Sequence, residues 1–404
     1  MTFRILSLDG GGTWALIEAM ALGDLYPGET GHQILSHFDL ATANSGGSIV
    51  LGGLMLDFTP AQIADFFLDE AKRKSIFFKK PFLEEELALH LPIFPRYVTA
   101  QKRNGLGAVF GASGGRQLTD WPATPGWPKG PAGEAVRILI VAFDYDRVRE
   151  VFLRSYAVGG TGATAEGIAL VDAVHASTNA PIAFFDAPAM VSPKRYWDGA
   201  MGGYNNPLMA AVVDAIALGA DPAAITALTM GTGTVRLLPP DLAHPSTPVE
   251  LVAPVAGRGM VTDLAKAAGC ITDDPPDAAT YTAHIVLRND PGVVGRVVRL
   301  SPVVQPVKDP ATGAWGYPPG LPAALFGPLT KLGMDAVEAA DVALIQKLAQ
   351  GWIANKAPNQ PLRMADDLSC ALGHPTYGAA KAHWAKLPAS RPRRRATRSS
   401  SKRA

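Results

Sequence analysis

The stretch "FDLATANSGGSIVLGGL", residues 38–54, runs from apolar residues through a polar Asn-Ser pair into small, glycine-rich sequence. Its first part, 38–43, predicts a buried strand because it is short, apolar and followed by turn-forming residues. Its second part, 47–57, has helical spacing. A strand and a helix joined this tightly are the basic unit of a parallel α/β sheet, and the turn between them has Ser45 at its apex.

The residues around Ser45 match the A-x-S-x-G form of a nucleophile elbow. In such an elbow the positions two before and two after the serine must be small, because the strand and the helix cross there. Ala43 and Gly47 satisfy this requirement, and Gly46 places a backbone N–H beside the hydroxyl. Taken alone, the pattern is equally compatible with an ordinary tight turn that has no catalytic role.

The stretch "LSLDGGGTW", residues 6–14, has the same layout earlier in the chain. Residues 3–8 predict a strand and residues 13–26 predict a helix. The turn between them contains three successive glycines (Gly10, Gly11 and Gly12). Glycines let the backbone approach a ligand closely, and a helix N-terminus carries partial positive charge. We therefore expect this turn to bind negative charge, either a phosphate or a developing oxyanion; a plain turn is the alternative.

Strands and helices alternate along much of the chain. This alternation predicts an α/β fold with three layers, in which helices cover both faces of a mainly parallel central sheet. Further strands are expected within 135–145, 148–157, 195–207 and 224–233. Further helices are expected at 60–74, 166–181, 208–219 and 335–355.

The stretch "YWDGAMGG", residues 196–203, places Asp198 at the end of a short expected strand. Sites of α/β proteins gather at the carboxyl ends of strands, and a carboxylate there could accept a proton from a serine hydroxyl. An aspartate followed by glycine is also common in ordinary turns.

In this order the three motifs resemble the patatin-like phospholipase family. The matching residues are "DGGGTWA" at 9–15, "ANSGG" at 43–47 and "DGA" at 198–200. Weaker matches cover "FDLATA" (38–43), "ASTNAPIAFFDAP" (176–188), "NNP" (205–207) and "TMGTGT" (229–234). The resemblance extends over about residues 3–235 and implies a lipid acyl hydrolase, phospholipase A-like, with a three-layer fold.

The resemblance also implies roles for individual residues. Ser45 would be the nucleophile and Asp198 the base, without a histidine, in a reaction through an acyl-enzyme. The oxyanion hole would consist of backbone N–H groups (those of Gly10, Gly11 and Gly12, with one more from Gly46). The residues that would support the motifs are Asp9, Ala43, Gly47 and Gly199. The substrate would be a lipid or phospholipid, and neither a metal nor a cofactor is expected.

Three positions depart from the family pattern. Trp14 replaces an arginine, Ala15 replaces the closing glycine of the turn, and Ala43 replaces the first glycine of the elbow. The two alanines are conservative in size, whereas Trp14 removes a guanidinium that could meet a headgroup phosphate. Of the eight histidines, His175 precedes the "STNAP" stretch; we interpret it as a satisfied helix residue and not as a member of a Ser-His-Asp triad.

Two other functions remain open from the sequence. The "LSLDGGGT" stretch also resembles the first phosphate loop of sugar kinases and actin-like ATPases, although that fold expects a duplicated core and leaves Ser45 unexplained. A patatin-like protein that binds lipid without hydrolysing it is the second alternative.

Composition sets the remaining expectations. The chain has 404 residues, is 48% hydrophobic and has a net charge of +1, which suits a compact enzyme. We expect a catalytic core at 1–235, with an excursion or lid at 75–133, followed by a part at 236–388 that packs on the core. Residues 389–404 are rich in basic side chains and predict a disordered tail.

The same composition bears on location and partners. Two cysteines in so long a chain indicate a reducing compartment, and no apolar run reaches the length of a membrane span. We therefore expect a cytoplasmic protein with transient peripheral contact to membranes at most. No specific nucleic-acid partner is expected.

Overall fold

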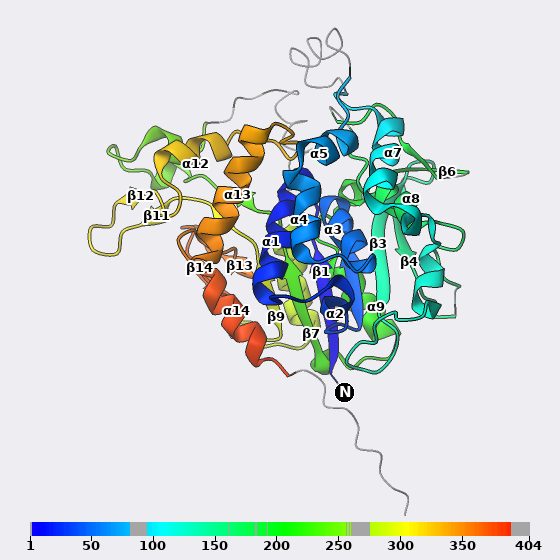
Figure 1. The fold of residues 1–404 in the computed structure, drawn as a ribbon. Helices are drawn as coiled ribbons and strands as arrows, with labels where there is room; N and C mark the ends of the chain where they lie inside the picture. The colour runs from blue at the N-terminus through cyan, green and yellow to red at the C-terminus, as the bar shows by residue number, and fades with distance from the viewer. Residues whose placement is uncertain are drawn as a thin grey trace, which may run out of the picture.

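The computed structural model describes residues 2–80, 95–160, 162–181, 184–191, 193–255, 257, 259 and 275–388. Within these ranges the chain forms a central sheet with helices on both of its faces (Figure 1). The predicted three-layer α/β/α arrangement with a mainly parallel sheet is therefore confirmed. The expected basic tail at 389–404 lies outside the described residues.

The central sheet has eight strands in the order β5-β6-β3-β2-β1-β7-β9, with β4 paired to β3. Five neighbouring strands run parallel: β1 (Phe3–Leu8), β2 (Leu40–Ala43), β3 (Arg137–Asp144), β7 (Ile225–Met230) and β9 (Val297–Leu300). The antiparallel strands are β4 (Arg149–Arg154), β5 (Ala189–Val191) and β6 (Lys194–Asp198). Both motif-bearing turns thus follow adjacent central strands.

The buried side chains divide between the two faces of the sheet, as the two-residue period of a strand requires. Phe3 and Ile5 of β1 belong to the apolar cluster beneath α9 (Leu208–Ala217) and α11 (Pro275–Val286). Leu6 and Leu8 belong to the larger cluster on the other face. Because β1 is buried on both sides, its sequence reads as a nearly continuous apolar run.

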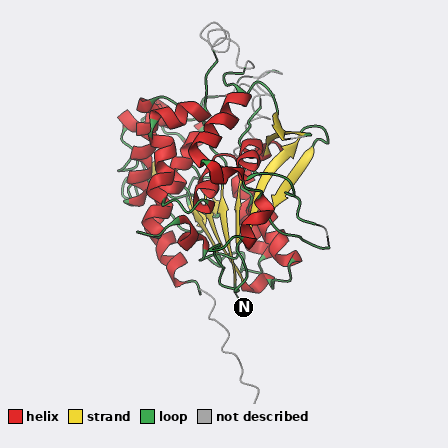
Figure 2. Cartoon of the chain, turned by 45° about the vertical axis from the view of Figure 1, so that its right-hand side comes forward, coloured by secondary structure: helices red, strands yellow, loops and turns green. Residues whose placement is uncertain are grey.

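Figure 2 shows the helices around the sheet. Most of the remaining helices contribute side chains to the larger cluster. They are α1 (Leu16–Leu25), α2 (Gly31–Leu35), α3 (Ser45–Met55), α4 (Pro60–Leu68), α5 (Glu70–Ile76), α7 (Thr99–Phe110), α8 (Leu170–Ser177), α12 (Ala323–Leu329), α13 (Ala339–Ile353) and α14 (Tyr377–Lys386). The expected helix at 60–74 is divided in two. Asp69 has an extended backbone between α4 and α5, and its carboxylate accepts the N–H of Lys72 at 2.9 Å.

The sheet continues beyond the expected division at residue 235, because β9 pairs with β7. The expected C-terminal part therefore supplies one strand of the central sheet. The described residues of the expected excursion at 75–133 also contribute to the core, since Leu106, Phe110 and Trp121 are buried there. None of the helices in the described ranges has both the length and the apolar character needed to cross a membrane.

Candidate active site

The pairing of β3 brings Asp198 to the elbow that carries Ser45. One edge of β3 pairs with β4 along its length, so β2 and β6 share the other edge. Along this edge Ile140 pairs with Ala43, the last residue of β2, and Ala142 pairs with Asp198, the last residue of β6. The two partners are two residues apart on β3, which corresponds to about 7 Å.

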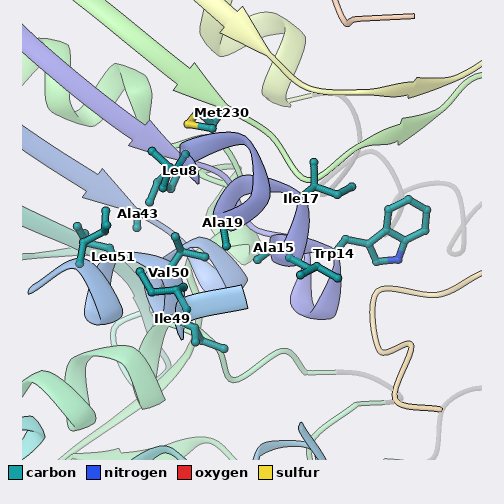
Figure 3. Close-up of a cluster of buried hydrophobic side chains, with 14 of the residues drawn as sticks. Leu8, Trp14, Ala15, Ile17, Ala19, Ala43, Ile49, Val50, Leu51 and Met230 are labelled. Atoms are coloured by element: carbon teal, nitrogen blue, oxygen red, sulfur yellow. The ribbon is translucent and has the colours of Figure 1, made fainter. Parts of the chain in front are cut away.

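The elbow itself has the backbone that a nucleophile turn requires. Ser45 is the first residue of α3 and has φ of 47°, in the left-handed region that non-glycine residues rarely adopt. Leu8, Ala43 and Met230, the last residues of three neighbouring strands, lie close to one another (Figure 3). A Cβ at Gly47 would approach the Asp9 carbonyl oxygen to 2.6 Å, so the elbow requires a glycine at that position.

A polar network joins Asp198 to the elbow. The Asn44 side-chain amide donates to Asp198 Oδ1 at 3.0 Å, and the Ala200 N–H donates to the same oxygen at 2.9 Å. The Ser45 N–H donates to Ser177 Oγ at 2.9 Å, which fixes the start of α3 against α8. Burial raises the pKa of the Asp198 carboxyl, while hydrogen bonds from the Ser45 hydroxyl, the Ala200 N–H and Asn44 oppose that rise.

The first glycine turn packs directly against the elbow. A Cβ at Gly46 would lie 2.8 Å from the Gly12 nitrogen and 2.5 Å from the Gly12 oxygen. Gly12 begins the short 3-10 helix Gly12–Ala15, and Gly46 lies in the first turn of α3. N–H groups at these helical positions have no acceptor within their own helix, so they can bind an oxyanion. The Gly10 N–H, in contrast, donates to the Asn205 carbonyl at 2.8 Å.

Gly11 packs against Thr232, which belongs to the "TMGTGT" stretch at 229–234. Thr232 donates its hydroxyl to the Gly10 carbonyl at 2.8 Å, and a Cβ at Gly11 would come within 2.0 Å of that hydroxyl oxygen. The glycines of the turn thus allow close packing against neighbouring segments. Gly199 has a comparable constraint, because a Cβ there would approach the Asn44 side-chain oxygen to 2.6 Å.

Asp9 is a buried structural acid. Its carboxylate forms an ion pair with Arg299 of β9 at 2.6 Å, and its N–H donates to Glu18 at 2.8 Å. Burial raises the pKa of Asp9 to about 6, although Arg299 opposes the rise. An aspartate already paired in this way is poorly suited to the magnesium-binding role expected of a kinase phosphate loop, and the continuous sheet lacks the duplicated core of that fold.

A small cavity opens beside Ser45. Two of its lining residues, Gly12 and Gly46, come from the turns described above, and Lys102 and Asp335 add charged groups. Its apolar lining comes from Ile49, Ile76, Phe77, Ala180, Phe184, Phe185 and Met334. An apolar wall next to a serine hydroxyl is suited to an apolar ligand group.

His175 lies in α8, as expected, but it is not satisfied. Its Nδ1 is buried without a hydrogen-bond partner in the described structure, and burial lowers its pKa to about 2. The prediction of a satisfied side chain was therefore wrong.

Several site residues were missed from the sequence: Asn44, Ser177, Lys102, Arg299 and Met334. Asn44 could have been identified as a candidate, because it is the first x of the A-x-S-x-G motif and directly precedes Ser45. Ser177 lies within the weaker family match at 176–188 and could also have been found. Lys102, Arg299 and Met334 lie far from the motifs in sequence, and only the fold brings them near. In the part of the chain that the structure describes, no three His, Cys, Asp or Glu side chains gather in a way that could hold a metal ion.

Residues 6–212, just over half of the chain, match the family model described as patatin-like phospholipase. Among solved structures, the crystal structure of VipD from Legionella pneumophila is similar with 12% sequence identity and a TM-score of 0.33. That comparison covers 87% of this chain and 67% of the other. A search among curated proteins gave no significant match.

Proposed function

Because the chain belongs to the patatin-like phospholipase family, a family of lipid acyl hydrolases, we propose that it hydrolyses lipid esters with Ser45 as nucleophile and Asp198 as base. The observation that carries this proposal is the shared edge of β3, which puts the carboxylate of β6 beside the elbow after β2. The Ser45 side chain is also the first of the groups that lower the pKa of Asp198 against the effect of burial, which supports direct proton transfer without a histidine.

In the acylation step, Ser45 Oγ attacks the acyl carbonyl carbon while its proton passes to Asp198. The carbonyl oxygen becomes an oxyanion next to the N–H groups of Gly11, Gly12 and Gly46. Such donors contribute roughly 2.7–4 kcal/mol each to transition-state stability. We leave Gly10 out of this set, because its N–H already donates to a carbonyl.

Collapse of the intermediate then breaks the ester bond. The alcohol portion leaves with the proton held by Asp198, and the acyl group remains bonded to Ser45 Oγ. In deacylation Asp198 takes a proton from water, the hydroxide attacks the acyl carbon, and the proton returns to Ser45 as the carboxylic acid departs. The apolar side chains of the cavity contact the acyl group next to Ser45.

The proposed substrate is a lipid or phospholipid, reached by transient peripheral contact with a membrane from the cytoplasm. No nucleic acid, metal or cofactor takes part in this proposal. The replacement of arginine by Trp14 bears on the headgroup and not on the proposed chemistry, since the Trp14 Nε1 donates to the Gly333 carbonyl at 3.0 Å and is not directed to a reacting group.

Ser45→Ala and Asp198→Asn test the dyad directly. We expect each to reduce kcat/KM for a short-chain p-nitrophenyl ester by at least about a thousandfold, since each removes a reacting group. Ser36→Ala, which alters a hydroxyl that bonds only to its own helix turn, is the matched control and should retain activity. Thermal unfolding of each variant checks that the fold is intact.

Labelling with a fluorophosphonate probe separates hydrolysis from silent lipid binding. The wild type should form a covalent adduct at Ser45 and Ser45→Ala should not. Full activity in either dyad variant would refute the mechanism. Absence of both adduct and turnover in the folded wild type would instead favour a lipid-binding protein without catalysis.

A further inference from the structure

A second cavity lies beside the cavity that contains Ser45, and we call the two the charged cavity and the serine cavity. The charged cavity has a volume of about 560 Å³, which is within the range of small-molecule sites. Asp335 lines both cavities. The two residues before it divide between them, since Met334 lines the serine cavity and Gly333 lines the charged cavity. A ligand that reaches Ser45 therefore has a second binding region next to it.

Two residues of the charged cavity contact the aromatic lining of the serine cavity. The Arg96 guanidinium carbon lies 5.2 Å from the centre of the Phe184 ring. The Tyr97 and Phe185 rings lie with their centres 5.7 Å apart. Both phenylalanines line the serine cavity, whereas the arginine and the tyrosine line the charged one. This change from aromatic to charged lining suits an amphiphile that has its apolar part beside Ser45 and its polar part in the charged cavity.

Charged side chains of both signs line the charged cavity. Among the described residues they are Lys79, Arg96, Lys331, Asp335, Glu338 and Asp341. Arg96 pairs with Asp335 at 2.9 Å. Lys79 pairs with Glu338, also at 2.9 Å. Four of the six charges are thus compensated within the lining of the cavity itself.

The other two charged side chains are those of Lys331 and Asp341. In the part of the chain that the structure describes, neither side chain forms a hydrogen bond or an ion pair. Lys331 is exposed and Asp341 is half-buried. They have opposite signs and line the same cavity, but they do not pair with each other. The charged cavity therefore offers one cation and one anion to a ligand.

The ends of two helices explain the signs of these charges but not their common cavity. Lys331 lies two residues after α12, and Asp341 lies in the first turn of α13. A cation is favourable near the C-terminus of a helix and an anion near its N-terminus. Neither interaction requires the two side chains to line one cavity next to Ser45. A ligand that carries both charges would satisfy the two side chains together.

We propose that the charged cavity binds the zwitterionic headgroup of a phospholipid, with Lys331 at its phosphate and Asp341 at its ammonium group. This inference rests on the proposed function and names its substrate class, since the ester of the same lipid lies at Ser45. The glycine turn offers no cation to the phosphate, because Trp14 stands where the family pattern has arginine. An anionic headgroup would leave Asp341 without a partner, and an uncharged lipid would leave both side chains without one.

The test compares three short-chain lipids below their critical micelle concentrations, so that binding to an aggregate does not enter KM. Dihexanoylphosphatidylcholine carries both charges, dihexanoylphosphatidylglycerol carries the phosphate alone, and dihexanoylglycerol carries neither. The wild-type kcat/KM for fatty acid release should fall in this order, by about fivefold to tenfold for each charge lost, since each contact is partly exposed to solvent.

Two variants assign the two charges separately. Lys331→Met should raise KM for both phosphate-containing lipids by about fivefold to tenfold, with a smaller effect on dihexanoylglycerol. Asp341→Asn should raise KM for the phosphatidylcholine and not for the phosphatidylglycerol, because only the former has an ammonium group. Lys347→Met removes an exposed lysine of α13 that is outside the described lining of the cavity. It is the matched control and should keep the three KM values in their wild-type ratios.

Equal hydrolysis of the three lipids by the wild type would overturn the headgroup site while leaving Ser45-dependent hydrolysis in place. So would a folded Lys331→Met variant that changes all three KM values alike, as expected if the lysine only stabilises a helix end. Calorimetric binding of sn-glycero-3-phosphocholine to Ser45→Ala tests the cavity without turnover, and adding Lys331→Met should weaken it about fivefold to tenfold. If this binding occurs but the wild type hydrolyses no ester, the proposed function fails and the headgroup site stands.

Discussion

The part of the chain that matches the family model, residues 6–212, differs in its contribution from the part that follows. The first part provides every group proposed to react: the Ser45 hydroxyl, the Asp198 carboxylate and the amides of the glycine turn. The second part provides none of these, but its residues form an ion pair and hydrogen bonds with the residues of the glycine turn. Arg299 pairs with Asp9, and the Met334 carbonyl accepts both the N–H and the hydroxyl of Thr13 at 2.9 and 3.0 Å.

This difference shows that the motif residues do not form a stable site by themselves and need contacts from residues far away in the sequence. Asp9 belongs to the most recognisable motif of the chain, but its buried charge is compensated by a residue almost 300 positions away in the sequence. Gly12 likewise faces the Met334 carbonyl, which a Cβ would approach to 2.2 Å. We expect changes in the second part to affect stability and site geometry, and changes in the first part to affect turnover.

The largest effect is expected for Arg299→Met. Both members of the Arg299–Asp9 pair are at most 3% exposed, and loss of one partner leaves a buried charge uncompensated, which costs about 3–5 kcal/mol of unfolding free energy. The pKa of Asp9, already raised to about 6, should rise further. The deficit should therefore shrink as the pH falls and Asp9 takes up a proton. Chemical denaturation at several pH values measures both effects.

Two further variants sharpen this result. Asp9→Asn in the Arg299→Met background should recover part of the lost stability, because it removes the uncompensated charge. Arg288→Met breaks a pair in which both side chains are more than 60% exposed, and should cost less than about 1 kcal/mol. A loss no larger in Arg299→Met than in Arg288→Met would contradict the supporting role assigned to the second part.

An intermediate effect is expected for Asn44→Ala in the first part. The Asn44 amide donates to Asp198 at 3.0 Å, and a hydrogen bond to a charged group contributes about 1.5–3 kcal/mol. If that contribution acts on turnover, kcat/KM should fall about 10- to 100-fold, and the acid limb of its pH profile should move upward because Asp198 loses a donor. Asn104→Ala, on an exposed position of α7, is the control. Lost stability with unchanged kinetics would place Asn44 with the supporting residues instead.

Much of the fold was predictable from the sequence, because the apolar period and the turn residues are local signals. β1, β2 and β7 were expected at nearly their observed positions, and the elbow was located from the small residues around Ser45. The meeting of Ser45 with Asp198 was implied only by the resemblance to a family. Its physical cause, the sharing of one edge of β3 by two strands, is a matter of pairing that no local pattern encodes.

The supporting residues were not predictable for a related reason. Arg299 lies within a stretch that gave no clear elements from the sequence, and its role depends on β9 joining the sheet beside β7. Lys102 has the sequence surroundings of a surface lysine, and only the packing of α7 against α8 buries it. A residue that compensates the charge of a partner far away in the sequence shows no characteristic spacing from that partner, so the sequence alone does not reveal the pair.

The smallest effect is expected for Trp14→Phe, at the contact between the two parts. The Trp14 Nε1 donates to the Gly333 carbonyl at 3.0 Å, and its ring lies against Gly233, where a Cβ would approach it to 3.3 Å. Phenylalanine keeps most of the apolar contact and loses the hydrogen bond, which is worth about 1 kcal/mol of unfolding free energy. Because Gly333 precedes Met334, a cavity-lining residue, KM for a long-chain ester should rise while kcat stays nearly constant. A large fall in kcat would mean that Trp14 reaches the reacting groups, and the separation between a reacting first part and a supporting second part would then fail at this residue.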